Sequence, residues 1–303
     1  MKPTTKPRIA LVQSHWHGGP EENLRAVLAL IDQVPEPVNL ICLPEFFLGA
    51  PWYFPGRAHL KEQIDQTIPG RITEVLAEVA ARKHSYILCG TMVELEHDRH
   101  YNTCVLIDDA GRLVGKTRKI HRFSAEMLSI DAGDSQLLVD TPFGRLGVCV
   151  CSDFWIVEMP RMLALRGAEI IAVPGAALRG NLPITRPCLQ ANSSFNVCYT
   201  LFAGGVGSVS GERGGRQVSI EVGGCSTVAG PEAIVTTCED EETVLCAELD
   251  MEYLRLMRTV DLSFRRSLYW CLHGRMPALY GDVCNHYVGK SDLEALLKQY
   301  LTQ

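Results

Sequence analysis

The sequence has no stretch that approaches the roughly 18–20 consecutive apolar residues that a membrane-spanning helix needs. Its first apolar run, residues 9–12, is too short for the hydrophobic part of a secretory signal. It also lacks a polybasic run, and its net charge is −6. Because phosphate binding needs a basic surface, this balance argues against nucleic acid as the main partner. We therefore predict a protein without membrane or nucleic-acid partners, whose ligand is a small molecule.

Cysteine is too sparse for a disulfide scaffold, since 12 of 303 residues is only about 4%. Without a secretory segment, the chain is predicted to be cytoplasmic, with its thiols reduced. Five cysteines lie in apolar strand-like runs and are expected to be small core residues: Cys42, Cys89, Cys104, Cys149 and Cys198. The question is whether any other thiol is reactive.

Short apolar runs alternate with amphipathic segments along the chain. Residues 9–12, 38–43, 86–93 and 145–151 are predicted strands, whereas 158–165 is a predicted helix. This alternation predicts an α/β fold in which helices cover sheets. The glycine-rich interval 204–224 contains a charged stretch, 211–216, that is expected to form an exposed hairpin tip.

No linker-like or repeated segment divides the chain, so we predict one domain over residues 1–260, followed by a C-terminal arm over 261–303. Ser291 and Glu294 form a capping box at the start of a predicted last helix. Its apolar stripe must pack on its own domain or on another subunit, and comprises Leu293, Leu296, Leu297, Tyr300 and Leu301.

Three reactive side chains follow predicted strands: Glu45, Lys119 and Cys151. In α/β folds, chemistry gathers at the carboxyl ends of strands. A carboxylate can take the thiol proton, the thiolate can attack a carbonyl or nitrile carbon, and an ammonium can stabilise the charge that develops. Taken singly, each has a more ordinary interpretation: a core thiol, a loop carboxylate and one lysine of a basic surface run.

The three reactive residues lie in three longer motifs: Leu43-Pro44-Glu45-Phe46, Gly115-Lys116-Thr117-Arg118-Lys119-Ile120-His121 and Gly147-Val148-Cys149-Val150-Cys151-Ser152-Asp153. In these motifs and in their order the chain resembles the carbon–nitrogen hydrolases, the nitrilase superfamily. The resemblance also includes Tyr101-Asn102-Thr103 and covers most of the chain.

The resemblance implies a four-layer αββα sandwich, often paired as a homodimer or higher homo-oligomer through a C-terminal tail. It implies that Glu45 is the general base, Lys119 the electrostatic stabiliser and Cys151 the nucleophile. Glu126 matches a second family glutamate that orients the site, and the backbone N–H of Ser152 would help to hold the oxyanion. We expect no cofactor and no metal.

The motif after the nucleophile favours an amide or carbamoyl amide as substrate over a nitrile. True nitrilases typically place Trp-Glu there, whereas this chain has Ser152-Asp153. Carbamoyl-amino-acid hydrolases can place two arginines next, where this chain has Phe154 and Trp155. We expect the substrate to contact these two residues and three others, namely Trp52, Tyr53 and Arg179.

Alternative interpretations come from different classes of protein. The chain could convert a nitrile to an acid, or keep the fold as a non-catalytic binding or assembly module. Cys149 and Cys151 could bind zinc together with His121 or a distant cysteine, although no second clustered pair accompanies them. His15 and His17 could form a metal pair, but such a pair is more often a polar loop feature.

Overall fold

The computed structural model describes residues 4–49, 60–213, 216–259 and 269–281, and two large β-sheets organise it. The first sheet has seven strands in the order β15-β1-β2-β3-β5-β4, with β6 also paired to β5. These strands are β1 (Arg8–Gln13), β2 (Leu40–Cys42), β3 (Tyr86–Leu88), β4 (Met92–Glu96), β5 (Arg99–Ile107), β6 (Leu113–Arg118) and β15 (Thr243–Glu248).

The second sheet has six strands in the order β14-β13-β10-β9-β8-β7. They are β7 (Leu138–Thr141), β8 (Gly144–Val148), β9 (Ile170–Gly175), β10 (Tyr199–Gly204), β13 (Thr227–Ala229) and β14 (Ile234–Thr237). In both sheets the central strands run parallel, β1 beside β2 and β8 beside β9 beside β10.

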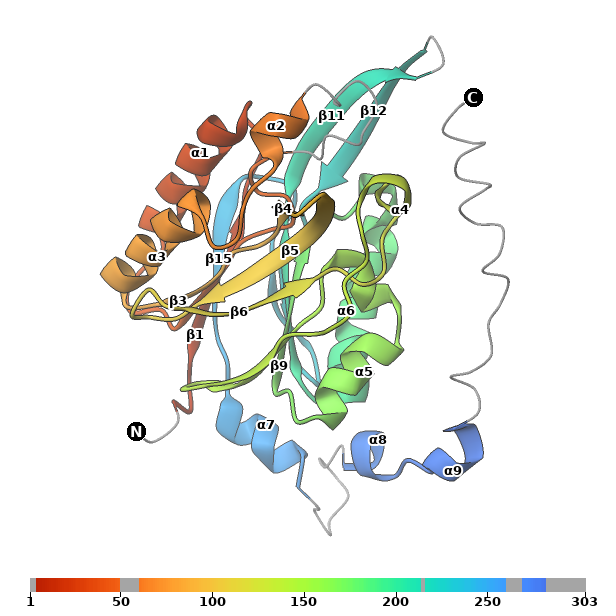
Figure 1. Cartoon of the computed structure of the whole chain (residues 1–303). Helices are drawn as coiled ribbons and strands as arrows, with labels where there is room; N and C mark the ends of the chain where they lie inside the picture. The colour runs from red at the N-terminus through yellow and green to blue at the C-terminus, as the bar shows by residue number, and fades with distance from the viewer. Residues whose placement is uncertain (1–3, 50–59, 214–215, 260–268, 282–303) are drawn as a thin grey trace.

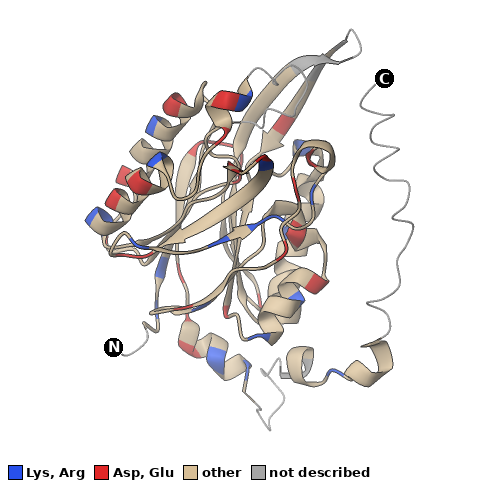
Figure 2. Ribbon diagram, in the orientation of Figure 1, with Lys and Arg blue, Asp and Glu red and all other residues tan. Residues whose placement is uncertain are grey.

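Helices cover the outer face of each sheet, which gives four layers (Figure 1). Helices α1 (Pro20–Asp32) and α3 (Arg71–Lys83) lie on one side, and α5 (Glu158–Leu165) and α6 (Leu182–Asn196) lie on the other. Acidic and basic side chains both occur along α1 and α3 (Figure 2). The remaining short helices are α2 (Lys61–Ile64), α4 (Glu126–Ser129), α7 (Met251–Met257), α8 (Tyr269–His273) and α9 (Pro277–Tyr280), with 3₁₀ turns η2 (Cys151–Trp155) and η3 (Arg179–Asn181).

The layers explain why the strands are continuous apolar runs rather than alternating ones. In β1, Ile9 and Leu11 belong to the core between the sheets, whereas Ala10 and Val12 pack in the core beneath α1 and α3. In β9, Ile170 points to the first core and Ile171 to the core beneath α5 and α6. A strand that is buried on both faces must be apolar at every position.

A two-stranded hairpin, β11 (Val206–Arg213) and β12 (Arg216–Gly223), projects from one end of the molecule (Figure 1). Its base is attached to both halves of the fold. The Val206 N–H donates to the Ser14 carbonyl (2.9 Å), just after β1, and the Gly223 N–H donates to the Ala177 carbonyl (3.0 Å), just after β9. The hairpin therefore spans the ends of the two sheets.

The predicted α/β fold and four-layer sandwich are confirmed, and α5 has the predicted bounds. The predicted strand 86–93 is instead two strands, because Gly90 lies between them with a φ of +54°. The predicted last helix at 291–301 lies outside the described residues. In the part of the chain that the structure describes, no helix is long and apolar enough to cross a membrane.

Candidate active site

Three predicted site residues meet between the two sheets. Glu45 follows β2, Lys119 follows β6, and Cys151 opens η2 shortly after β8. The Lys119 ammonium lies 2.9 Å from Glu45 Oε1, and Cys151 lines the same cavity as both residues, close enough for the Glu45 charge to raise the pKa of Cys151. Three side chains from distant parts of the sequence thus lie within reach of one another.

A second carboxylate, Glu126 at the start of α4, completes this group. Its Oε2 atom lies 2.7 Å from the Lys119 ammonium and accepts a hydrogen bond from the Phe123 N–H at 2.6 Å. Glu45, Lys119 and Glu126 are each only 2% exposed. Two carboxylates and one ammonium are therefore buried together.

Asn102 holds the two carboxylates in place from the middle of β5. Its Nδ2 atom donates to Glu45 Oε1 and to Glu126 Oε1, both at 2.9 Å. Asn102 is fully buried. No role was predicted for it, although a buried amide within an apolar strand needs polar partners and is in itself a signal.

Burial and charge shift the pKa values in this group. Burial raises the pKa of Glu45, and the neighbouring Lys119 only partly offsets this. Burial works against the Lys119 charge, but the Glu126 and Glu45 carboxylates outweigh it, so the pKa of Lys119 lies well above its usual value. The pKa of Cys151 is raised by burial and by the Glu45 charge. The resting site is thus a neutral thiol beside an ionised lysine.

Backbone geometry turns Cys151 away from the line of its strand. Its φ is +44°, in the left-handed region that costs a non-glycine residue on the order of 1–3 kcal/mol. Such outliers persist where the surrounding structure enforces them, and they cluster at active sites. We had predicted a strand through Cys151, but β8 ends at Val148 and a tight 3₁₀ turn follows.

Asp153 fixes this turn against the segment that follows Lys119. Its carboxylate is buried and accepts hydrogen bonds from the N–H groups of Val150 (3.3 Å) and His121 (2.7 Å). The Ser152 hydroxyl donates to the His121 carbonyl. The segments that carry Cys151 and Lys119 are thereby joined side by side.

A cavity of about 140 Å³ opens over the reactive group and reaches Glu45, Lys119, Glu126 and Cys151. Its other walls are mostly apolar: Trp16, Phe46, Phe123, Ala176, Leu178, Ile220 and Val222. These wall residues come from five separate segments. Sequence reasoning missed them, because nothing in the local sequence relates these segments to one another.

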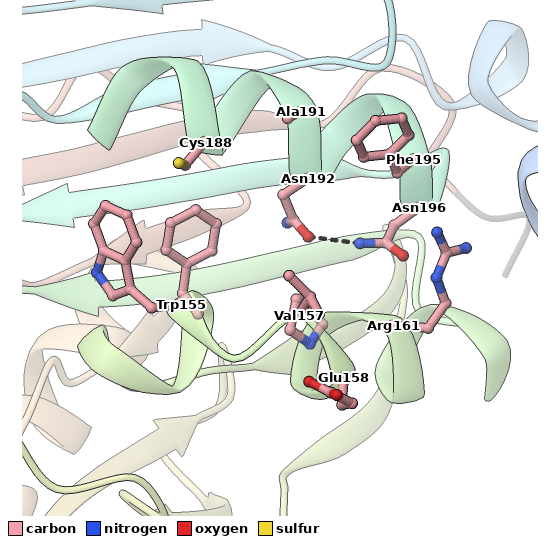
Figure 3. Close-up of a pocket in the computed structure, with 11 residues that line it drawn as sticks. Trp155, Val157, Glu158, Arg161, Cys188, Ala191, Asn192, Phe195 and Asn196 are labelled. Carbon is pink, nitrogen blue, oxygen red and sulfur yellow. Dashed lines mark hydrogen bonds between the residues drawn. The ribbon is translucent and has the colours of Figure 1, made fainter. Parts of the chain in front are cut away.

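Phe154 and Trp155 lie on the other side of Cys151. They line a smaller cavity of about 40 Å³ that also contains Cys151 and Ser152. They also line a larger one of about 360 Å³ between α5 and α6 (Figure 3). The substrate contact predicted for Phe154 and Trp155 would therefore be made in the cavity of about 40 Å³.

Among the other predicted substrate contacts, the structure describes only Arg179, which does not line the 140 Å³ cavity. The Arg179 guanidinium pairs with Glu221 (3.0 Å) and with Asp240 (2.9 Å), and is about half exposed. Trp52 and Tyr53 lie outside the described residues.

The residues considered for zinc do not form a site. Cys149 packs in the core beneath α5 and α6, whereas Cys151 lines the cavity, so the two thiols do not converge on one site. Across residues 4–49, 60–213, 216–259 and 269–281, no group of three or more His, Cys, Asp or Glu side chains could hold a metal ion. His15 and His17 lie near each other, and the His17 ring pairs with Glu242 at 3.0 Å.

The sequence model of the carbon–nitrogen hydrolase family matches residues 8–259 of this chain. This chain belongs to the carbon–nitrogen hydrolase family. An omega-amidase from Xenopus laevis is 31% identical over 282 residues, which cover 87% of this chain and 97% of that protein. A nitrilase from Pyrococcus abyssi is 34% identical over 249 residues, which cover 80% and 89%.

The fold matches solved structures of the same family. A carbon–nitrogen hydrolase from Helicobacter pylori superposes with a TM-score of 0.82 at 20% identity, covering 93% of this chain and 100% of that one. As a carbon–nitrogen hydrolase, the protein is an enzyme, and the predicted family and fold are confirmed.

Proposed function

We propose that this carbon–nitrogen hydrolase cleaves a non-peptide amide or carbamoyl amide through a thioester on Cys151. The observation that carries the proposal is that Cys151, Glu45 and the Lys119 ammonium line one cavity, with Lys119 in contact with Glu45. The identity to an omega-amidase supports an amide as the substrate class.

In the first half of the reaction, Glu45 accepts the Cys151 proton as the sulfur attacks the carbonyl carbon of the amide. A raised pKa suits this role, because a base is most useful when its pKa approaches the working pH. The oxyanion that forms would lie near Lys119 and the Ser152 N–H. Collapse expels ammonia or an amine, which takes the proton from Glu45, and leaves the thioester.

In the second half, Glu45 takes a proton from water while the water oxygen attacks the thioester carbon. The tetrahedral intermediate uses the same oxyanion donors. Its collapse breaks the C–S bond, releases the acid and returns the proton to the Cys151 sulfur. Glu126 and Asn102 act as positioning residues, because they hold Lys119 and Glu45 by hydrogen bonds.

A nitrile is the second candidate substrate, favoured by the identity to a nitrilase. The same thiol could attack a nitrile carbon, and two water molecules would then yield acid and ammonia. The deciding experiment is an assay of ammonia release over small amides, carbamoyl compounds and nitriles, with Cys151→Ala as the control. We expect turnover of amides that the variant loses; turnover of nitriles alone would contradict the proposal.

Alkylation of the thiol tests the non-catalytic alternative. Iodoacetamide should label Cys151 in step with the loss of activity, because this thiol lies in an open cavity beside a base. Glu45→Gln should slow labelling of Cys151 at least tenfold, because the resting thiol is neutral and glutamine cannot take its proton as the sulfur attacks. The half-buried Cys188 serves as a control within the same molecule, since Glu45 does not contact it. Equal labelling of Cys151 in both proteins would favour a non-catalytic module.

We also propose that the protein pairs with a second copy of itself through α5 and α6, with the arm over residues 261–303 contributing contacts. Most of the side chains around the 360 Å³ cavity between these helices are apolar (Figure 3), and among them Val157 is 74% exposed and Phe195 is 61% exposed. Glu158 and Arg161 line the same cavity, so a two-fold arrangement could pair one with the other across the interface.

Light scattering on the purified protein tests this assembly. We expect a dimer that Val157→Asp converts to monomer, because a charge would be buried at the interface. The matched control is Val235→Asp on β14, another exposed valine that lies outside this cavity. A monomeric wild-type protein would contradict the proposed pairing.

We propose a cytoplasmic location. The cysteines that the structure describes are all free, and thiols remain reduced in that compartment. Cell fractionation with an antibody against the protein tests this location; recovery in a membrane or secreted fraction would contradict it.

A further inference from the structure

The cavity over Cys151 has a shape and a chemical character of its own. Its volume of about 140 Å³ is close to the roughly 150 Å³ of an engineered apolar cavity that binds benzene. Six large apolar side chains form its walls, namely Trp16, Phe46, Phe123, Leu178, Ile220 and Val222. The cavity is therefore large enough for a branched acyl group of a few carbons or for an aromatic ring.

The hairpin supplies one complete wall of the cavity. Ile220 and Val222 alternate with Ser219 and Glu221 along β12, so the two apolar side chains share the face that lines the cavity. Leu178 and Val222 form an antiparallel bridge, which ties this wall to the segment after β9. The wall is thus held by backbone pairing.

Trp16 forms another part of the enclosure, beside the hairpin, and has contacts on two sides. Its indole N–H donates to the Phe46 carbonyl at 3.0 Å. On the hairpin, Gly207 has a φ of +139°, and a Cβ there would lie 3.4 Å from a Trp16 ring carbon. Gly207 therefore provides a backbone conformation that residues with a side chain rarely adopt, and it lies in contact range of the indole.

The charged side chains in the described part of the cavity disfavour the binding of a substrate that carries a negative charge. Lys119 already contacts both Glu45 and Glu126, so the local sum of these three charges is negative. A substrate carboxylate would lose its hydration against the apolar walls and would also meet these two carboxylates. An uncharged apolar group has neither penalty and gains from its burial.

We propose that the enzyme selects amides whose acyl group is uncharged and apolar, of branched aliphatic or aryl type, and that Ile220 and Val222 of the hairpin determine this selectivity. The inference rests on the proposed amide hydrolysis and adds the acyl class. It makes the hairpin a part of the substrate site, although the hairpin carries none of the reacting groups.

A matched pair of substrates tests this selectivity. 4-Methylpentanamide and succinamate have nearly the same shape, with an isopropyl group in the first where the second has a carboxylate. We expect kcat/KM for 4-methylpentanamide to exceed that for succinamate by at least about 100-fold, since the carboxylate must be desolvated. An equal or higher value for succinamate would overturn the inference while leaving amide hydrolysis intact.

Substitutions in the hairpin test which residues are responsible. Ile220→Arg places a cation in the wall and should raise the ratio of succinamate to 4-methylpentanamide turnover at least about tenfold. Ser219→Arg places the same cation on the opposite, exposed face of the strand and should leave the ratio unchanged. Equal effects of both variants would contradict a role for the wall.

A different experimental result would show that the proposed function itself is wrong. If neither amide released ammonia, and no other amide or carbamoyl compound did so in a Cys151-dependent manner, amide hydrolysis itself would be contradicted. The acyl selectivity would then be rejected with it.

Discussion

The carboxylate of Asp153 contacts His121 at two points: it accepts a hydrogen bond from the backbone N–H at 2.7 Å and lies 2.9 Å from the ring Nδ1 atom. The same carboxylate accepts from the N–H of Ile120 and from that of Val150. One buried side chain therefore sets the spacing between the segment that follows Lys119 and the turn that begins at Cys151. This contact also gives His121 a role that the sequence left open.

Replacing Asp153 should loosen the site without removing a reacting group. We expect Asp153→Asn to lower kcat about 10- to 100-fold and to lower Tm, because an amide offers one acceptor oxygen where the carboxylate has two. Steady-state kinetics and thermal unfolding check this. Asp140→Asn is the matched control, since Asp140 is exposed and pairs only with Arg145 among the described residues. Unchanged kcat in Asp153→Asn would contradict the positioning role.

Asn102 should be needed because it bridges the two carboxylates. In Asn102→Leu both Glu45 and Glu126 lose a hydrogen-bond donor in a buried site, and we expect kcat to fall about 10- to 100-fold. Asn102→Asp should be worse, because it adds a third carboxylate beside a single ammonium. Kinetics of the two variants side by side test this; an Asp variant as active as the wild type would contradict the bridging role.

Glu45 should contribute to activity at the expense of stability. Its pKa is raised in the folded protein, so the folded state binds this proton more tightly than the unfolded chain, and ionisation at neutral pH disfavours folding. We expect Glu45→Gln to lower kcat at least about 1,000-fold, because the base is lost. Its Tm should rise, or stay within the few degrees that about 1 kcal/mol gives in a chain of this size.

Thermal unfolding at several pH values gives the control for this prediction. The stability advantage of Glu45→Gln should shrink as the pH falls toward the raised pKa of Glu45, where the wild-type side chain also becomes neutral. A stability advantage of Glu45→Gln that grew as the pH fell would contradict the prediction.

The dependence of kcat/KM on pH should follow the pKa shifts of Glu45 and Lys119. Activity should fall on the acid side at a pH above 4.5, the usual glutamate value, because Glu45 must be ionised to act. No loss from lysine deprotonation is expected below pH 10.5, since the pKa of Lys119 is raised above that value. Profiles recorded with one amide in buffers of constant ionic strength check this; an acid limb below 4.5 would contradict it.

The fold could be predicted from the sequence where local pattern is decisive. The bounds of α5 agree because its apolar spacing is that of an amphipathic helix. The predicted strand 9–12 lies within β1 because burial on both faces requires a continuous apolar run. Strand β11 was not predicted, because its glycines and serines resemble a loop. Its pairing with β12 supplies the order that local propensity does not.

The candidate site, like the fold, could be predicted only in part from the sequence. Three motifs indicated which thiol, carboxylate and ammonium to examine, and the structure brings these side chains together. The left-handed backbone at Cys151 could not be predicted, because it depends on the distant contacts of Asp153. Trp16 and Ile220 are about 200 residues apart in the chain and meet only in the folded cavity.

The imbalance of two carboxylates and one ammonium also bears on how the reaction ends. The proposed product is an acid, which ionises once formed, whereas the amide that entered was neutral. The new anion lies between apolar walls and the carboxylates of Glu45 and Glu126, so the cavity that admits the substrate expels the product. Departure of the acid is thereby driven by its own ionisation, and product inhibition and resynthesis of the amide are both disfavoured.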